Sequence, residues 1–340
     1  MARITNHITV LIIAIFITMA TVRATNCNVK DIYRAEADSF LKAIPDSMQI
    51  RQADAVYKAI GGDYGALASV RMSRNVQPEL PKGVSCNLVT GNMVLFRCDR
   101  YYNDTIPLLV YFHGGGWTIG SINSCTRFCA AMAINGVAVL AVDYRLAPEH
   151  PYPEGLTDCV DAVKCAADSL DVWRCAGISL GGDSSGGNLA IATAMSFPEG
   201  TFDSLIAFYP VTKAYRDNSS SWNEYGDGFG LDNRLMDAFN SAYTKDPHKP
   251  LISPADTPDT WLKKLPPTLL IAAERDILKD QGLEFAERLR SLGKEVRYDM
   301  IPGSVHLFIT VPGQNKAFSH AVSAASEFLS HNSGTTYVQR

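Results

Sequence analysis

The chain has 340 residues, a length that suits a single α/β domain carrying an insertion. Hydrophobic residues make up 46% of it, enough for a large buried core, and the formal net charge is only −4. This charge balance excludes the strongly basic surface with which proteins bind nucleic acid.

The first 24 residues have the pattern of a secretory signal peptide. Arg3 lies in a short polar start, an apolar run extends from Ile8 to Ala20, and small residues around Ala24 form a cleavage site. A membrane anchor is the weaker alternative, because the run is short for a span of about 20 residues and two threonines interrupt it. We expect cleavage after Ala24, a secreted or periplasmic mature chain, and no stable membrane insertion of that chain.

The even number of cysteines favours disulfides in an exported chain. All eight occur in the first 175 residues: Cys27, Cys86, Cys98, Cys125, Cys129, Cys159, Cys165 and Cys175. The segment VSCNLVTGNMVLFRC alternates around Thr90-Gly91-Asn92, which predicts a hairpin with a three-residue loop, and we expect this hairpin to set Cys86 opposite Cys98. Asn103 and Asn218 begin glycosylation sequons, which matter only in a host that glycosylates.

Short apolar runs alternate with helical patterns over most of the chain, which predicts a mostly parallel sheet covered by helices. The runs are residues 108–112, 137–144, 175–180, 204–210, 268–273 and 296–301. Two segments break the alternation, one helical in pattern and one rich in Ser, Asn, Asp, Gly and Pro, and such segments commonly form a lid over the strand ends. The expected organisation is a signal peptide (1–24), an N-terminal cap segment (25–80), a core (81–211 and 263–332) interrupted by a cap insertion (212–262), and a tail (333–340).

The motif LLVYFHGGGWTIG places three glycines directly after a predicted strand. Glycines at such a turn let backbone N–H groups face a cavity, where they can stabilise an oxyanion. We expect the N–H groups of Gly115 and Gly116 to form an oxyanion hole with a third N–H group, that of the residue after a nucleophile.

The stretch CAGISLGGDSSGGNLAIATAM contains the nucleophile pattern Gly-x-Ser-x-Gly twice, around Ser179 and around Ser184. A nucleophile at a strand-to-helix turn needs small residues two positions before and after it, with a strand behind and a helix ahead. Ser179 lies inside the apolar run, and Ser185 has Asp183 two positions before it. Ser184 meets all the requirements and is the predicted nucleophile, which leaves the N–H of Ser185 for the oxyanion hole.

In combination, HGGGW, DYRLAPEHPYP and GDSSGGN make the chain resemble the hormone-sensitive-lipase family of α/β-hydrolase-fold esterases. The resemblance covers residues 80–330. It implies an eight-stranded, mostly parallel sheet with flanking helices, a helical cap, carboxylester hydrolysis, and a catalytic serine, acid and histidine in that order along the chain.

The acid and the base are sought after Ser184, at the ends of strands. Asp276 matches the family's acid position, although Ile277 replaces the usual proline, and Glu274 and Asp280 are the alternatives. His306, in the loop PGSVHLF after a predicted strand, is the expected base, because His320 lies in a helical stretch and His331 in the tail. Leu307 departs from the family's usual glycine.

These residues predict a serine carboxylesterase that acts on small, short-acyl esters through an acyl-enzyme and needs no metal or organic cofactor. Three alternatives remain open on the same scaffold: a carbohydrate deacetylase, an amidase, and a ligand-binding receptor. The aromatic residues Trp117, Trp222 and Phe229 are candidates for lining an acyl pocket, although core packing explains them equally well.

Overall fold

The structure is a computed structural model that describes residues 29–45 and 47–333. The predicted signal peptide, its cleavage site and Cys27 lie outside the described residues, as do residues 334–340 of the predicted tail.

Eight strands form one sheet in the order β1-β2-β4-β3-β5-β6-β7-β8. They are β1 (Val84–Thr90), β2 (Met93–Cys98), β3 (Ile106–Phe112), β4 (Ala138–Val142), β5 (Cys175–Asp183), β6 (Leu205–Phe208), β7 (Thr268–Arg275) and β8 (Val296–Val305). The pairs β1·β2 and β2·β4 are antiparallel, and all pairs from β4 through β8 are parallel. The eight-stranded, mostly parallel sheet that the sequence predicted is therefore confirmed, and its parallel strands end on the same edge.

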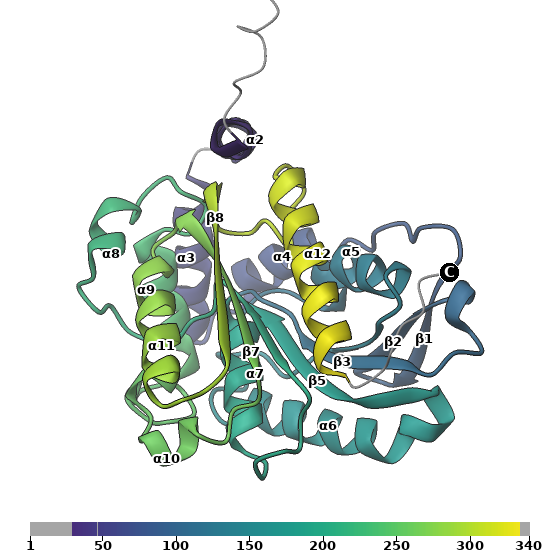
Figure 1. The fold of residues 1–340 in the computed structure, drawn as a ribbon. Helices are drawn as coiled ribbons and strands as arrows, with labels where there is room; N and C mark the ends of the chain where they lie inside the picture. Colours follow the sequence, from purple (N-terminus) through teal and green to yellow (C-terminus); the bar gives the residue numbers. More distant parts are fainter. Residues whose placement is uncertain (1–28, 46, 334–340) are drawn as a thin grey trace, which may run out of the picture.

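Helices cover both faces of the sheet, which explains why the central strands are apolar throughout (Figure 1). One face packs against α5 (Ile122–Ile134) and α12 (Asn315–Asn332), the other against α6 (Glu154–Trp173), α7 (Ser185–Met195) and α11 (Lys279–Ser291). In β3, Leu108 and Val110 contribute to one core and Leu109 and Tyr111 to the other, as alternation along a strand requires.

The predicted β1–β2 hairpin forms, but the expected pairing of Cys86 with Cys98 is wrong. Cys86 lies opposite Phe96, and Cys98 lies opposite Val84. With a three-residue loop at 90–92, the numbers of two paired residues add up to 182. Cys86 and Cys98 add up to 184, so the expected partner of Cys86 was two residues too far along β2. The two cysteines are therefore diagonal neighbours, whose separation of about 7–8 Å exceeds the Cα separation of a disulfide. All seven described cysteines are free thiols.

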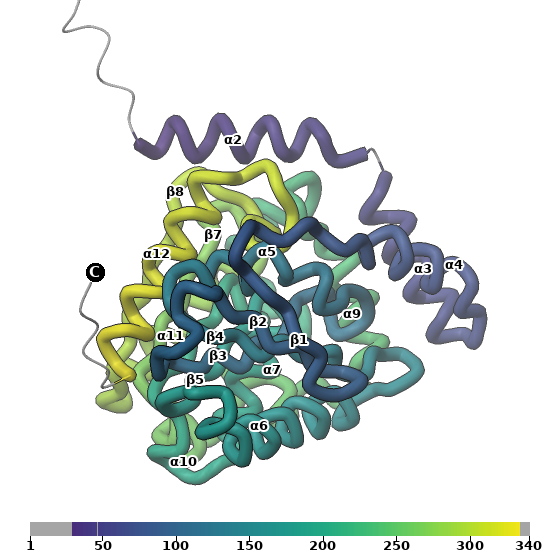
Figure 2. Tube along the Cα trace, turned by 90° about the vertical axis from the view of Figure 1, so that its right-hand side faces the viewer, coloured from purple at the N-terminus to yellow at the C-terminus, as the bar shows by residue number. Residues whose placement is uncertain are grey.

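The helices outside the predicted core come from two separate parts of the chain. The first part contains α2 (Val29–Ala43), α3 (Met48–Ile60) and α4 (Gly65–Arg74), and the second contains α8 (Ser220–Glu224), α9 (Asn233–Tyr243), the 3₁₀ turn η2 (Pro254–Asp256) and α10 (Asp259–Leu262). Figure 2 shows α2 lying along β8 and α12 before the chain turns into α3 and α4. Helix α3 packs against α9, whereas α10 lies at the opposite end of the molecule from α2 (Figure 1).

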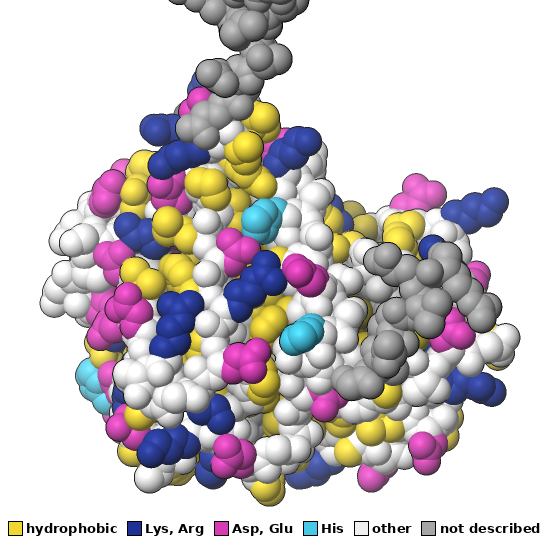
Figure 3. Space-filling view, viewed as in Figure 1, with side chains coloured by type: hydrophobic (Ala, Val, Ile, Leu, Met, Phe, Trp, Pro, Cys, Tyr) yellow, Lys and Arg dark blue, Asp and Glu magenta, His cyan; other side chains and the backbone are white. Residues whose placement is uncertain are grey.

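The surface shows the mixed charge that the composition indicates. On the face shown in Figure 3, Lys and Arg side chains are interspersed with Asp and Glu side chains. Among the described residues, no helix is both long and apolar enough to span a bilayer.

Candidate active site

Ser184 occupies a sharp turn between β5 and α7. Its backbone has φ 54° and ψ −118°, a conformation that non-glycine residues rarely adopt, and its N–H donates to the carbonyl of Phe208 on the next strand. A Cβ atom at Gly182 would overlap the backbone of Gly186, and one at Gly186 would overlap the carbonyl of Phe112. The turn therefore requires the two glycines that flank Ser184 in the sequence motif.

The other two serines of the motif have different surroundings. Ser179 lies in the interior of β5, opposite Leu109 of β3, and is buried. Ser185 begins α7 and is fully buried, with no partner for its hydroxyl in the described part of the chain.

His306 and Asp276 reach Ser184 from the ends of β8 and β7. The Nε2 atom of His306 lies 3.1 Å from the Oγ of Ser184, and its Nδ1 atom lies 2.5 Å from the Oδ2 of Asp276. The second carboxylate oxygen of Asp276 accepts the N–H of Leu278 at 2.9 Å, and the ring of Tyr209 packs against the imidazole. Both His306 and Asp276 are 1% exposed. The structure thus joins the three residues in one continuous row of hydrogen bonds.

The two alternative acids are engaged elsewhere. Glu274 pairs with Lys30 at 2.6 Å and accepts the N–H of Gly303. Asp280 accepts the N–H of Ser221 at 2.8 Å. Neither forms a hydrogen bond with His306 in the described chain, so Asp276 is the carboxylate that holds the imidazole.

The glycine loop after β3 lies beside Ser184. Gly115 and Gly116 have φ values of 121° and 60°, and a side chain would collide with the carbonyl of Ile119 at Gly115 or with the ring of Phe239 at Gly116. Gly115 lines the cavity with Ser184, whereas Gly116 and Ser185 are not among the lining residues. Within the described chain, no hydrogen bond is found for the N–H of Gly115, Gly116 or Ser185.

Asp183 ties the glycine loop to the turn that carries Ser184. Its Oδ1 atom accepts the N–H of Gly114 at 3.0 Å and the hydroxyl of Tyr111 at 2.9 Å. Burial raises the pKa of Asp183 to about 6, because the low-dielectric interior penalises the carboxylate. Burial also lowers the pKa of His113, whose ring stacks on Tyr144 at a centroid distance of 4.4 Å. Asp183 and His113 thus hold the loops around the serine.

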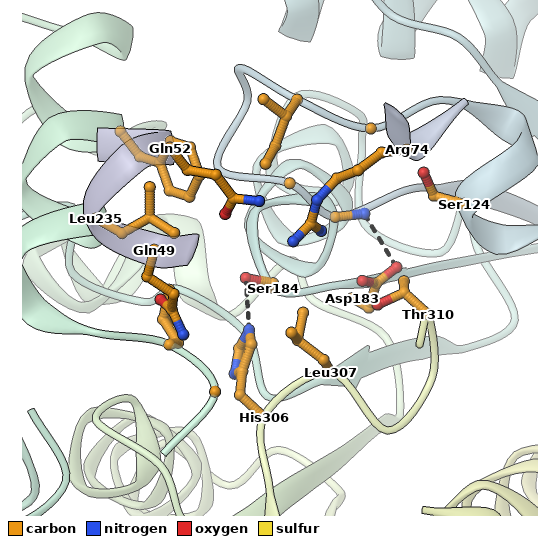
Figure 4. Close-up of a pocket in the computed structure, with 17 residues that line it drawn as sticks. Gln49, Gln52, Arg74, Ser124, Asp183, Ser184, Leu235, His306, Leu307 and Thr310 are labelled. Carbon is orange, nitrogen blue, oxygen red and sulfur yellow. Dashed lines mark hydrogen bonds between the residues drawn. The ribbon is translucent and has the colours of Figure 1, made fainter. Parts of the chain in front are cut away.

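A cavity of about 40 Å³ opens onto Ser184 and His306 (Figure 4). Its walls come from α3, α4, α5, α9 and the loops after β3, β5 and β8. Besides Ser184, His306 and four glycines, the lining residues are Gln49, Gln52, Arg74, Ile119, Ser124, Asp183, Leu231, Leu235, Phe239, Leu307 and Thr310. The described residues contain no group of three His, Cys, Asp or Glu side chains placed to hold a metal ion.

The aromatic residues singled out from the sequence do not line this cavity. Trp117 is buried and stacks on Tyr243 at a centroid distance of 4.3 Å, Trp222 is buried in the core, and Phe229 contacts Tyr225. Sequence reasoning missed Phe239 on α9 and the two glutamines of α3. The available signal was Gln49 and Gln52, three residues apart on the otherwise apolar face of a helix.

Comparison with known proteins gives consistent results. A profile of a family described as alpha/beta hydrolase fold matches residues 109–310. A protein of Acanthamoeba polyphaga mimivirus, whose name assigns it only to the alpha/beta hydrolases, is 34% identical over 293 residues, or 83% of this chain and 84% of its own. Carboxylesterase NlhH of Mycobacterium tuberculosis is 30% identical over 324 residues, or 88% of this chain and 98% of its own. A thermostable esterase from Pseudomonas putida ECU1011 has a similar solved structure, with a TM-score of 0.74 and 24% identity over 88% of this chain and 97% of that one.

Proposed function

The chain belongs to the hormone-sensitive-lipase-like family of the α/β-hydrolase fold, and from this membership we propose that it is a serine carboxylesterase acting on small, short-acyl esters. The observation that carries the proposal is the row of hydrogen bonds from Asp276 through His306 to Ser184. The carboxylesterase and esterase names of the relatives support an ester as substrate.

In the proposed reaction, Nε2 of His306 takes the proton from the hydroxyl of Ser184 while the oxygen attacks the ester carbonyl carbon. The carbonyl oxygen becomes an oxyanion that accepts the N–H groups of Gly115, Gly116 and Ser185. The intermediate then expels the alcohol, which receives the proton from His306 and leaves an acyl-enzyme. Water repeats the same steps to release the acid. Asp276 fixes the tautomer of the imidazole and stabilises its charged form.

The size of the cavity supports short acyl groups. Its volume is about 40 Å³, and one water molecule needs about 10–15 Å³ of such space. Leu231, Leu235 and Phe239 give the walls an apolar part that suits a few methylene groups.

The first test is hydrolysis of p-nitrophenyl esters from acetate to palmitate by the mature protein and three variants. We expect the wild type to prefer short chains and Ser184→Ala to lose at least about 10³-fold in kcat. Ser179→Ala and Ser185→Ala are matched controls, since each removes a buried hydroxyl and keeps every backbone N–H. Loss of activity in Ser179→Ala alone would show that Ser179, and not Ser184, is the nucleophile. A wild type inactive on every ester, but active on acetamides or N-acetyl sugars, would replace the esterase proposal with an amidase or deacetylase.

We also propose that residues 1–24 direct export and are removed. The support is the sequence pattern alone, because these residues lie outside the described part of the chain. Expression in a secreting host and N-terminal sequencing of the product test it. Thr25 as the first residue is the expected result, and a product that starts at Met1 inside the cell would contradict it.

A further inference from the structure

Arg74, the last residue of α4, is a cation in the wall of the cavity that contains Ser184. In the described chain its side chain forms no ion pair and no hydrogen bond. Arg71, one turn earlier on the same helix, is by contrast neutralised by Glu149 at 2.6 and 2.8 Å. Figure 4 shows the guanidinium of Arg74 pointing into the cavity above Ser184.

The surroundings of Arg74 leave its charge uncompensated. Burial lowers the pKa of Arg74, yet a guanidinium remains protonated in proteins. The neighbouring Gln52 does not compensate it, because the buried Oε1 atom of Gln52 has no hydrogen-bond partner in the described chain. Asp183 also lines the cavity, but its carboxylate accepts the N–H of Gly114 and the hydroxyl of Tyr111 and forms no ion pair with Arg74 in the described chain. A partly buried cation of this kind, with no partner in the described chain, is stabilised when an anion enters the cavity.

The backbone that carries Arg74 is held firmly against the glycine loop. Arg71 donates from Nε to the carbonyl of Thr118 at 2.9 Å, and Asn75 accepts the hydroxyl of Ser121 at 2.7 Å. These bonds lie on either side of Arg74 along the chain and fix the end of α4 to the loop that follows β3. A recognition residue gains precision when its supporting elements are fixed in this way.

We propose that Arg74 binds a carboxylate carried by the acyl group of the substrate, so that half-esters of short dicarboxylic acids are the preferred substrates. This inference rests on the proposed esterase function. Figure 4 places Arg74 and His306 on different sides of Ser184. Because His306 must protonate the leaving alcohol, the alcohol oxygen lies toward His306, and the acyl chain extends toward Arg74. The carboxylate itself takes no part in bond breaking.

The test compares two pairs of esters that differ only in charge. On the acyl side, monomethyl succinate is compared with its neutral analogue methyl 4-oxopentanoate, with methanol release as the readout. On the alcohol side, O-acetylglycolate is compared with acetoxyacetone, with acetate release as the readout. The measured quantity is the ratio of kcat/KM for the charged ester to that for the neutral ester, in wild type, Arg74→Gln, Arg74→Lys and Arg51→Gln. Arg51→Gln removes the same charge from the exposed surface of α3, outside the cavity.

We expect the acyl-side ratio to fall about 10- to 100-fold in Arg74→Gln, the usual value of a hydrogen-bonded charged contact. Arg74→Lys should keep part of the ratio, because a point charge replaces the bidentate guanidinium, and Arg51→Gln should keep all of it. An unchanged ratio in Arg74→Gln, or a change confined to the alcohol-side pair, overturns the proposal. If Arg74→Gln does not fold, as judged by thermal unfolding, Arg74→Lys decides instead: an acyl-side ratio below that of the wild type supports the proposal, and an unchanged ratio overturns it. A wild type that hydrolyses none of the four esters defeats the esterase function itself, whereas hydrolysis without any charge preference defeats only the role of Arg74.

Discussion

The backbone of Leu307 lies in the left-handed region, with φ 73°, directly after the proposed base. The related esterases that the sequence resembles usually have glycine here. Such a conformation costs a non-glycine residue about 1–2 kcal/mol. We therefore expect Leu307→Gly to be more stable than Leu307→Ala by about 1 kcal/mol, since both remove the leucine side chain and only glycine relieves the backbone.

Urea unfolding of the two variants measures this difference. The matched control is the same pair at Leu283, an exposed position within α11, where glycine should be the less stable by about 1 kcal/mol. If alanine is the more stable residue at both positions, the backbone at Leu307 carries no strain.

A second prediction concerns the pH dependence of stability through Asp183. Burial raises its pKa from 3.8 to about 6, so the folded protein binds the proton more tightly than the unfolded chain does. This contribution to stability is present below about pH 4 and is lost as the pH rises through about 6. The side chain of Asp183→Asn cannot titrate. In the wild type both Tyr111 and Gly114 donate to Oδ1 of Asp183, so the single carbonyl oxygen of the asparagine can still accept both hydrogen bonds. The free energy of unfolding of the variant, relative to that of the wild type, should therefore increase by on the order of 3 kcal/mol as the pH rises from 4 to 7.5.

Urea unfolding of wild type and Asp183→Asn at four pH values between 4 and 7.5 tests this prediction. A stability difference that stays constant over the range would mean that Asp183 titrates normally.

At the scale of residues, the sequence reveals the part of the site that depends on local backbone geometry. Ser184 requires its two neighbouring glycines, and His306 and Asp276 follow strands, so short motifs identify them. The sequence around Arg74 and Phe239 contains no such motif. They reach the cavity only because α4 and α9 dock against the sheet, and that docking depends on contacts between distant parts of the chain.

Among the elements, α2 is held to the ends of β7 and β8 by a close approach at Gly303. Gly303 has φ 73°, and a Cβ atom there would lie 2.8 Å from the backbone nitrogen of Arg34 in α2. Gly293 has a similar φ of 77°, with nothing within 4 Å of such an atom. Alanine at either position adds backbone strain of about 1–2 kcal/mol. Only alanine at Gly303 also pushes α2 away, at a further cost of about 1–3 kcal/mol.

The expected result is therefore that Gly303→Ala lowers the free energy of unfolding more than Gly293→Ala and exposes residues 29–43. Hydrogen exchange of these residues by mass spectrometry shows whether α2 loosens. Equal protection of α2 in both variants would show that the contact with Arg34 is easily relieved.

The strands were predictable because burial on both faces leaves an uninterrupted apolar run, and all six runs named from the sequence correspond to strands β3–β8. The hairpin was predictable from its turn, but its register was not. Thr90 pairs with Met93 and Leu88 with Val94, so the ladder shifts by one residue near the turn. A side-chain pairing inferred across such a turn is sensitive to a miscount of one or two residues.

At the scale of the whole molecule, four of the seven described cysteines are buried as free thiols: Cys125, Cys129, Cys159 and Cys175. Burial raises the pKa of the Cys159 thiol, and it raises that of Cys175 to about 11. The pKa of the Cys125 thiol is also raised, first by its hydrogen bond with Cys129, whose sulfur lies 3.7 Å away, and then by burial. A thiol that stays protonated oxidises and exchanges slowly. If the mature chain is exported, these thiols are protected by the core itself.

The same reasoning predicts that a reducing agent leaves the thermal stability unchanged. One disulfide typically contributes about 2–4 kcal/mol, which moves the unfolding midpoint of a domain of this size by several degrees. The measurement is thermal unfolding of the mature Cys27→Ser chain with and without a phosphine reductant, because Cys27 lies outside the described residues. Equal midpoints, together with seven thiols titrated after denaturation, are expected. A midpoint that falls by several degrees on reduction would show that two of these cysteines form a disulfide and would contradict the prediction.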